Sequence, residues 1–198
     1  MRPRVVQFML GVVAFVGAST TALVGTPAGI EAWGTARVGG RLERNAVVWL
    51  DAPGAPDRPR TETVVLDQRN QNFYPHVLVV RVGTNVELPN NDRVFHNVFS
   101  FHNGKRFDLG LYPVGTSRRV TFDRPGLSRI FCNIHPNMAA YVIAVDTPYF
   151  ALSDGAGRFQ MSSVLPGTYT YHAWRPGGPD LTGSTMVQPG TSLDIHWP

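Results

Sequence analysis

Hydrophobic residues in this chain come in short runs separated by turn residues. From residue 46 onward, runs of four to seven residues rich in Val, Ile, Phe and Tyr alternate with stretches rich in Gly, Pro, Asn and Asp. After the first 28 residues, no segment repeats apolar side chains with the period of an amphipathic helix. The pattern therefore predicts an all-β fold.

The predicted strands fall into two sets. The run HVLVVRV at residues 76–82 is apolar on both alternating faces until Arg81, which predicts a strand in the middle of a sandwich. The first set covers 46–50, 63–66, 76–82, 85–88, 96–101, 118–122, 128–132 and 140–145, and the second covers 149–152, 158–161, 168–174, 184–187 and 192–197.

Residues 1–28 have the pattern of a secretory signal peptide, with Arg2 and Arg4 before an apolar run and small residues after it. The apolar run is too short for a comfortable membrane span, although an uncleaved anchor is the alternative. The mature chain has no later apolar stretch of spanning length, so we expect a periplasmic protein without a transmembrane span. Cleavage removes two arginines and no acid, so the net charge of +4 falls to +2.

This charge distribution speaks against nucleic acid binding. The mature chain is nearly balanced, and its basic residues form only isolated pairs such as Arg118 with Arg119. Basic side chains can still guide an acidic protein partner.

The stretch FCNIHPNM, residues 131–138, contains the only cysteine of the chain. Cys132, His135 and Met138 are spaced so that one loop can direct all three toward one point. Thiolate and thioether are soft ligands and imidazole is intermediate, so the set favours copper. A second imidazole is available from His96, which follows the turn-like sequence NND, whereas His102 is expected in a loop.

The segments FYPHVLVVRVGTNVELPNNDRVFHNVFS and VTFDRPGLSRIFCNIHPNMAAYVIAV resemble the plastocyanin and azurin group of cupredoxins. They are most similar to periplasmic cupredoxin-like proteins labelled methylamine-utilisation proteins. The resemblance implies a Greek-key β-sandwich, here a cupredoxin domain at residues 61–146, with one type 1 copper. It assigns the copper ligands to His96, Cys132, His135 and Met138, and it implies that Asn97 ties the two ligand loops together.

The segments GTARVGGRLERNAVVWLDAP and TPYFALSDGAGRFQMSSVLPGTYTYHAW resemble two parts of a carboxypeptidase regulatory-like, or prealbumin-like, β-sandwich. Leu165 stands where that family often has a proline. The resemblance implies a second small sandwich that is discontinuous, from residues 31–60 and 147–198, with the proline-rich stretch 51–60 as a linker. The cupredoxin domain would then be inserted into it.

Together these features predict a periplasmic type 1 copper protein that carries single electrons and is not an enzyme. The resemblance implies that electrons leave through His135, within an apolar surface patch to which Pro136, Ala139 and Ala140 are expected to contribute. The expected partner is a redox protein that binds transiently.

Two alternatives remain open from the sequence. In the first, His76 is an additional ligand, as a glutamate is in the similar nitrosocyanin type, and the copper performs chemistry on a small molecule. Asp92 and Asp108 are the nearby acids, but they are expected to shape turns. In the second, copper only stabilises the fold, and the flanking sandwich binds a polysaccharide or a protein.

Overall fold

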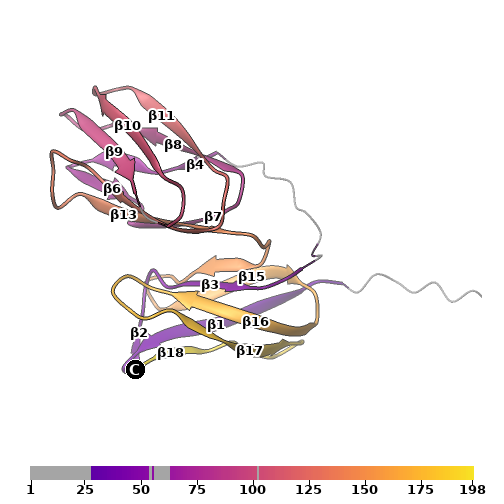
Figure 1. Cartoon of the computed structure of the whole chain (residues 1–198). Coiled ribbons are helices and arrows are strands. Elements are labelled where there is room, and N and C mark those ends of the chain that lie inside the picture. Colours follow the sequence, from indigo (N-terminus) through magenta and orange to yellow (C-terminus); the bar gives the residue numbers. More distant parts are fainter. Residues whose placement is uncertain (1–27, 54, 56–62, 102) are drawn as a thin grey trace, which may run out of the picture.

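The computed structural model describes residues 28–198, except for 54, 56–62 and 102. Within these residues the chain forms eighteen β-strands and no helix, arranged as two stacked sandwiches (Figure 1). The predicted all-β fold is confirmed. The predicted signal peptide, apart from residue 28, and most of the predicted linker lie outside the described residues.

One sandwich, which we call the site sandwich, consists of a five-stranded sheet and a three-stranded sheet. The strand orders are β10-β9-β12-β13-β7 and β11-β8-β4, so chain neighbours such as β7 and β8 lie in different sheets. Val86, Leu88, Val98 and Ile130 are fully buried between the sheets. The bounds are β4 Val64–Val65, β7 Val77–Arg81, β8 Thr84–Pro89, β9 His96–Ser100, β10 Phe107–Tyr112, β11 Ser117–Phe122, β12 Gly126–Phe131 and β13 Ala139–Val145.

The other sandwich, which we call the flanking sandwich, combines strands from both ends of the described chain. Its sheets are β15-β1-β18, with β2 paired to β1, and β14-β3-β16-β17. Its hydrophobic cluster includes the fully buried Ala36, Val48 and Leu50 from the first part and Val164 from the second. The bounds are β1 Ile30–Val38, β2 Arg41–Leu42, β3 Val47–Leu50, β14 Phe150–Leu152, β15 Arg158–Val164, β16 Gly167–Trp174, β17 Leu181–Val187 and β18 Ile195–Trp197. The division into a cupredoxin domain and a discontinuous sandwich domain stays a prediction about folding units.

Strands β7 and β13 are packed on both of their faces. One face lies against the core of the site sandwich, and the flanking sandwich covers the other face. In β13, Val142 points into the site sandwich, while Ile143 and Val145 join a separate cluster with Val47 and Trp174 of the flanking sandwich. Alternate strand residues point to opposite faces, which explains why these runs are apolar throughout. The sequence correctly indicated two buried faces for the 76–82 run, although β7 lies at the edge of its sheet.

A short hairpin, β5 (Asp67–Arg69) and β6 (Asn72–Tyr74), accompanies the site sandwich. It was absent from the predicted strands, because its polar sequence and its Asn70–Gln71 turn without glycine give no ordinary hairpin signal. Leu66, which precedes it, and Phe73 within it are buried in the core of the site sandwich, so the hairpin is fixed to that sandwich.

No helix among the described residues is long and apolar enough to cross a membrane.

The cluster between the two sandwiches should contribute to stability. Ile143 is only 3% exposed there, so Ile143→Ala leaves a cavity and should lower the free energy of unfolding by about 2–5 kcal/mol. Ile134→Ala is the matched control, because Ile134 is 48% exposed. Urea unfolding of the metal-free protein measures both changes. Equal effects of the two substitutions would contradict the packing described between the sandwiches.

Candidate metal centre

Two strand ends bring the first two predicted ligands together. His96 is the first residue of β9, and Cys132 follows the last residue of β12. The two strands are antiparallel neighbours, with Phe131 opposite Phe99, so the residues that follow β12 run beside the beginning of β9. The sheet therefore joins segments that are 36 residues apart in the sequence.

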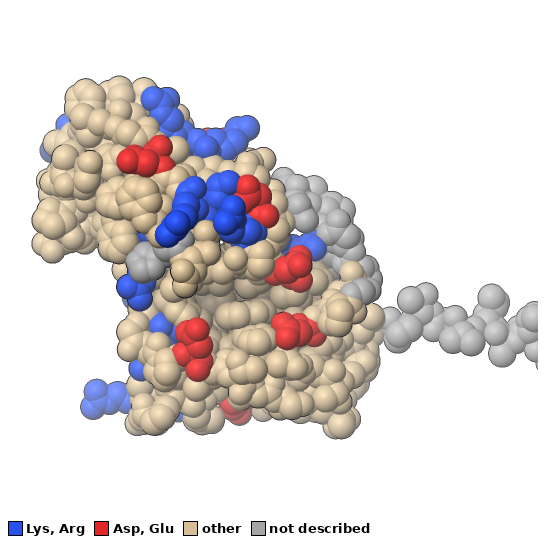
Figure 2. Space-filling model, in the orientation of Figure 1, with Lys and Arg blue, Asp and Glu red and all other residues tan. Residues whose placement is uncertain are grey.

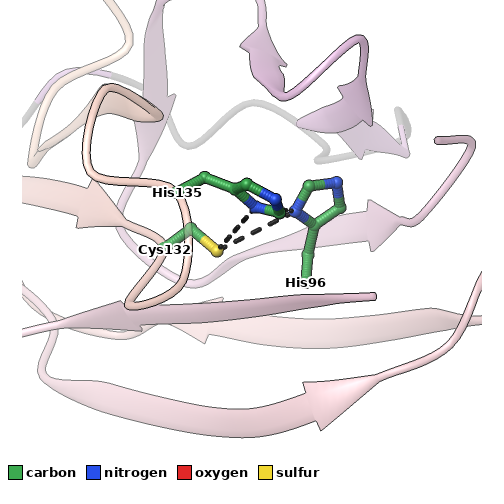
Figure 3. A group of neighbouring side chains, drawn as sticks. All are labelled: His96, Cys132 and His135. Atoms are coloured by element: carbon green, nitrogen blue, oxygen red, sulfur yellow. Dashed lines mark hydrogen bonds between the residues drawn. The ribbon is translucent and has the colours of Figure 1, made fainter. Parts of the chain in front are cut away.

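The loop after β12 adds His135 to form a group of three donor atoms (Figure 3). The Cys132 Sγ atom lies 3.8 Å from Nδ1 of His96 and 3.6 Å from Nδ1 of His135. The two Nδ1 atoms are 3.1 Å apart. Two nitrogen lone pairs at this distance repel each other unless a proton or a cation lies between them. We call these three residues the donor group, and their convergence fits a metal ion.

Met138, the fourth predicted ligand, is fully buried in the same hydrophobic cluster as Cys132. Its N–H donates a hydrogen bond to the His135 carbonyl at 2.9 Å, which closes the ligand loop into a turn. The loop therefore returns to the core at Met138, three residues after His135. A thioether in this position suits a soft ion such as copper, together with a thiolate and two imidazoles.

Asp92 contacts the Nε2 nitrogen of the His96 ring, on the side away from Cys132 and His135. This contact was not predicted from the sequence. Its Oδ2 atom lies 2.9 Å from Nε2 of His96, and the side chains are 8% and 0% exposed respectively. Burial alone would raise the pKa of Asp92, but hydrogen bonds from the N–H groups of Gln71 and Arg93 and from His96 lower this pKa to about 2. Asp92 is therefore a carboxylate, and Nε2 of His96 donates to it. The spacing of an acid four residues before a histidine was the available signal.

Asn97 makes no side-chain hydrogen bond to the second ligand loop among the described residues, so the expected link is not seen. Its Nδ2 group donates to Oδ1 of Asp108 at 2.7 Å, within the β9–β10 pair. Its Oδ1 atom is buried without a hydrogen-bond partner among the described residues. Asn97 thus ties β9 to β10. Asp108 also accepts a hydrogen bond from the Gly110 N–H at 2.9 Å, at an irregularity in the pairing of β10 with β9, so it lies within a strand and not in the turn expected of it.

His76 lies outside the donor group. Its Nδ1 atom is 3.1 Å from the carbonyl oxygen of Ala139, and its ring contacts Tyr141 edge-on with 5.4 Å between the ring centres. These contacts place it between β7 and β13 as a structural histidine.

The other described histidines, His172 and His196, lie outside the donor group. His102 lies outside the described residues. His172 pairs through Nε2 with Oδ2 of Asp51 at 2.9 Å and stacks on Trp49, within the flanking sandwich. His196 is exposed in β18.

The exposed apolar residues beside the donor group include Pro136, as the sequence predicted, but not Ala140. His135 is partly exposed, and Ile134 and Pro136 on either side of it are exposed. Ala140 is 1% exposed, so its predicted place in the surface patch is wrong. It alternates inward with Val142 in β13. Two residues that precede His96 extend the apolar surface in its place, Val94 at 38% and Phe95 at 50% exposure.

The carboxylate of Asp92 should make stability depend on acid pH. Its pKa is lower in the folded chain, so its contribution is complete above about pH 4 and is lost as the pH falls toward about 2. The metal-free protein should therefore lose about 2 kcal/mol more unfolding free energy over this range than Asp92→Asn does. Urea unfolding at several pH values measures this. Parallel declines in the two proteins would contradict the charged hydrogen bond.

Several solved structures are similar to part of the chain. No family model and no curated protein matches the chain. The purple cupredoxin from Nitrosopumilus maritimus is 24% identical over 41% of this chain and 99% of its own, with a TM-score of 0.38. An oxidized methionine-to-leucine mutant of amicyanin is 19% identical over 51% of this chain and 99% of its own, with a TM-score of 0.39.

A Cu-containing nitrite reductase from Thermus scotoductus SA-01 is 25% identical over 47% of this chain, with a TM-score of 0.42. The match spans only 24% of the reductase chain. The likeness of the flanking segments to carboxypeptidase regulatory-like domains stays a prediction, because no family model matches. These similar structures include cupredoxins, and the two sheets of the site sandwich form the β-sandwich that the sequence predicted.

Proposed function

We propose that this protein is a type 1 copper protein that carries single electrons between redox partners in the periplasm. The observation that carries the proposal is the donor group, in which one thiolate sulfur and two imidazole nitrogens all lie within 4.8 Å of one another. Met138 is buried close behind it. The proposed ligands are His96, Cys132 and His135, with Met138 as a weak axial ligand.

The donor types support copper over other common metals. Two histidines, one cysteine and a weak methionine form the ligand set of blue electron-transfer sites, whereas structural zinc sites use four strong ligands. Bound copper would supply the one-electron Cu(I)/Cu(II) couple. The protein supplies a rigid frame, because His96 and Cys132 are fixed by the pairing of β9 with β12 and are 0% and 4% exposed.

His135 is the proposed exit for electrons. It is the most exposed member of the donor group, and Ile134, Pro136, Val94 and Phe95 form an exposed apolar surface around the two histidines. Such a surface can desolvate quickly against a partner without a large permanent interface, as a transient redox contact needs. We call these four residues the docking patch.

The first 28 residues and the charged side chains support two further parts of the proposal, the periplasmic location and the kind of partner. The sequence of residues 1–28 supports export to the periplasm. Figure 2 shows Lys and Arg side chains gathered on the site sandwich, with acidic side chains also present. These basic side chains would attract a partner with an acidic surface.

Carrier function is proposed in preference to catalysis because the acids near the donor group are already engaged. Asp92 accepts hydrogen bonds from His96 and Gln71, and Asp108 accepts them from Asn97 and Gly110. His76 bonds the backbone of β13 instead of pointing a free nitrogen at the donor group. Neither a general base nor an additional ligand is therefore offered by these described residues.

A separate cavity is our proposed place for the polysaccharide or protein contact of the flanking sandwich. It has a volume of about 450 Å³ and lies where the two sandwiches meet. Trp49 and Trp174 line it on the flanking sandwich, with Leu127 and Ile143 on the site sandwich. Its lining includes no member of the donor group, so such binding would be independent of copper.

The copper site predicts a specific optical result. The mature chain loaded with Cu(II) should show an intense blue absorption band and narrow copper hyperfine splitting in its EPR spectrum. Cys132→Ser should abolish the band, because the thiolate ligand is lost, whereas His76→Ala should leave it unchanged. A red or green centre that changes on loss of His76 would instead support small-molecule chemistry.

The Cys132→Ser variant also tests the alternative in which copper only stabilises the fold. A metal-dependent fold would lose most of its stability in this variant. A folded variant that has lost electron transfer alone would exclude that alternative.

The docking patch predicts slower electron transfer when a charge is placed on it. Ile134→Glu should lower the second-order rate with the redox partner by about tenfold, because the glutamate must be desolvated on binding and repels an acidic partner surface. Met186→Glu is the control, since it makes the same change in net charge at a residue that is 56% exposed on β17 of the flanking sandwich. Stopped-flow measurement gives both rates. Equal rates in the two variants would place electron exit elsewhere.

A further inference from the structure

We propose that Asp92 is a positioning residue that fixes the His96 ring for the metal and sets the balance between the two copper oxidation states. We further propose that the β5–β6 hairpin holds Asp92 in place. This inference rests on the proposed function of the donor group as a copper centre.

The first step concerns the two nitrogens of His96. A neutral imidazole carries one proton, and only the other nitrogen has a lone pair for a metal. Nε2 of His96 lies 2.9 Å from a carboxylate oxygen of Asp92, which can only accept a hydrogen bond. The proton is therefore on Nε2, and the lone pair is on Nδ1, which faces Cys132 and His135.

Water does not compete for this contact. The His96 side chain is 0% exposed, and the Asp92 side chain is 8% exposed. A charge-assisted hydrogen bond is stronger in such surroundings than at the surface. The Nε2 atom of the His96 ring is thus held by Asp92, and its Nδ1 atom faces Cys132 and His135.

The second step concerns what holds Asp92. Both of its carboxylate oxygens are occupied, with the Gln71 N–H donating to Oδ2 at 2.6 Å and the Arg93 N–H donating to Oδ1 at 2.7 Å. Its own N–H donates to the Oδ1 atom of Asn90 at 3.1 Å. The Oδ2 atom of Asp92 accepts hydrogen bonds from both Gln71 and His96. A single oxygen therefore links the hairpin to the proposed copper ligand His96.

The hairpin turn is shaped for this contact. Asn70 and Gln71 have φ angles of +51° and +54°, the left-handed conformation that a two-residue hairpin turn needs at both positions. Glycine is the usual residue there, since other side chains are strained in this region. The turn presents the Gln71 N–H toward Asp92 instead of toward solvent.

A second pair of bonds joins the hairpin to the loop before His96. The Asn91 N–H donates to the Gln68 carbonyl at 3.0 Å, and the Asn91 Nδ2 group donates to Oδ1 of Asp67 at 2.9 Å. The hairpin therefore contacts both residues 91 and 92. One of these contacts reaches the donor group through Asp92, and the other does not.

The negative charge of Asp92 should favour the more highly charged copper ion. A carboxylate bonded to a ligand imidazole raises the basicity of that ligand, and loss of such a partner commonly lowers metal affinity by about 10–100-fold. Cu(II) should lose more affinity than Cu(I) when the charge is removed. A tenfold difference between the two losses equals a rise in reduction potential of about 59 mV for one electron.

The test uses three variants of the mature full-length chain. Asp92→Asn keeps a hydrogen-bond acceptor for Nε2 but removes the charge, and Asp92→Ala removes both. Asp67→Asn is the matched control, because it makes the same chemical change at the hairpin residue that binds Asn91 and not His96. The asparagine keeps an oxygen that can accept from Asn91. The measurements are the reduction potential, the Cu(II) EPR spectrum and the ¹⁵N NMR shifts of the His96 ring in the metal-free protein.

Support for the proposal consists of three results together. Asp92→Asn raises the potential by tens of millivolts, which corresponds to about a tenfold relative loss of Cu(II) affinity. Asp67→Asn keeps the wild-type potential and EPR spectrum. The metal-free wild type carries the His96 proton on Nε2, and Asp92→Ala loses this preference.

Two results would overturn the proposal. One is a potential that changes equally, or not at all, in Asp92→Asn and Asp67→Asn. The other is a metal-free wild type with the His96 proton on Nδ1, which needs no copper to observe. Failure of the proposed function is distinguishable from both, because the wild type itself would then show no blue band with Cu(II).

Discussion

The pairing of β9 with β12 is the constraint on which the donor group depends. It places His96, at the start of one strand, beside Cys132, at the end of the other, with Phe131 opposite Phe99. The other contacts that form the donor group lie within one short loop. The loop from Cys132 to Met138 needs only a short turn, closed by the bond from the Met138 N–H to the His135 carbonyl, to bring its histidine to the same point. A sheet is stiff, so the strand pairing itself fixes the positions of His96 and Cys132.

The ligand types and their spacing could be read from the sequence because they depend on chemistry and chain distance alone. The structure brings three of the four predicted residues together and buries Met138 beside them. The role of Asp92 could not be read in the same way. An acid after two asparagines has the composition of a turn, and its contact with His96 depends on how the β5–β6 hairpin folds back on that turn. Ala140 was misplaced because alternation in a strand, and not closeness in sequence, decides which face a residue joins.

The first strand of the flanking sandwich shows another limit of pattern analysis. β1 lies at the centre of its sheet, yet its inward residues are small, with Ala32 and Ala36 buried on either side of Gly34. A β-branched or aromatic residue at position 34 would collide with the backbone of Leu193, since even a Cβ atom there would lie 1.8 Å from its carbonyl oxygen. The strand is therefore buried without being strongly hydrophobic. Burial here follows from close backbone approach, which composition does not reveal.

The pairing of β1 also has a consequence for the order in which the chain can assemble. Its neighbours are β15, with Trp33 opposite Gln160, and β18, with Ala36 opposite Ile195. When a chain emerges from its N-terminus, β1 can pair at first only with the two residues of β2, and its longer neighbours β15 and β18 follow residue 145. Every strand of the site sandwich finds its neighbours between residues 64 and 145. Contacts between distant residues form slowly because a long loop must close first. The site sandwich can thus be complete before β1, which precedes it in the chain, has joined its own sheet.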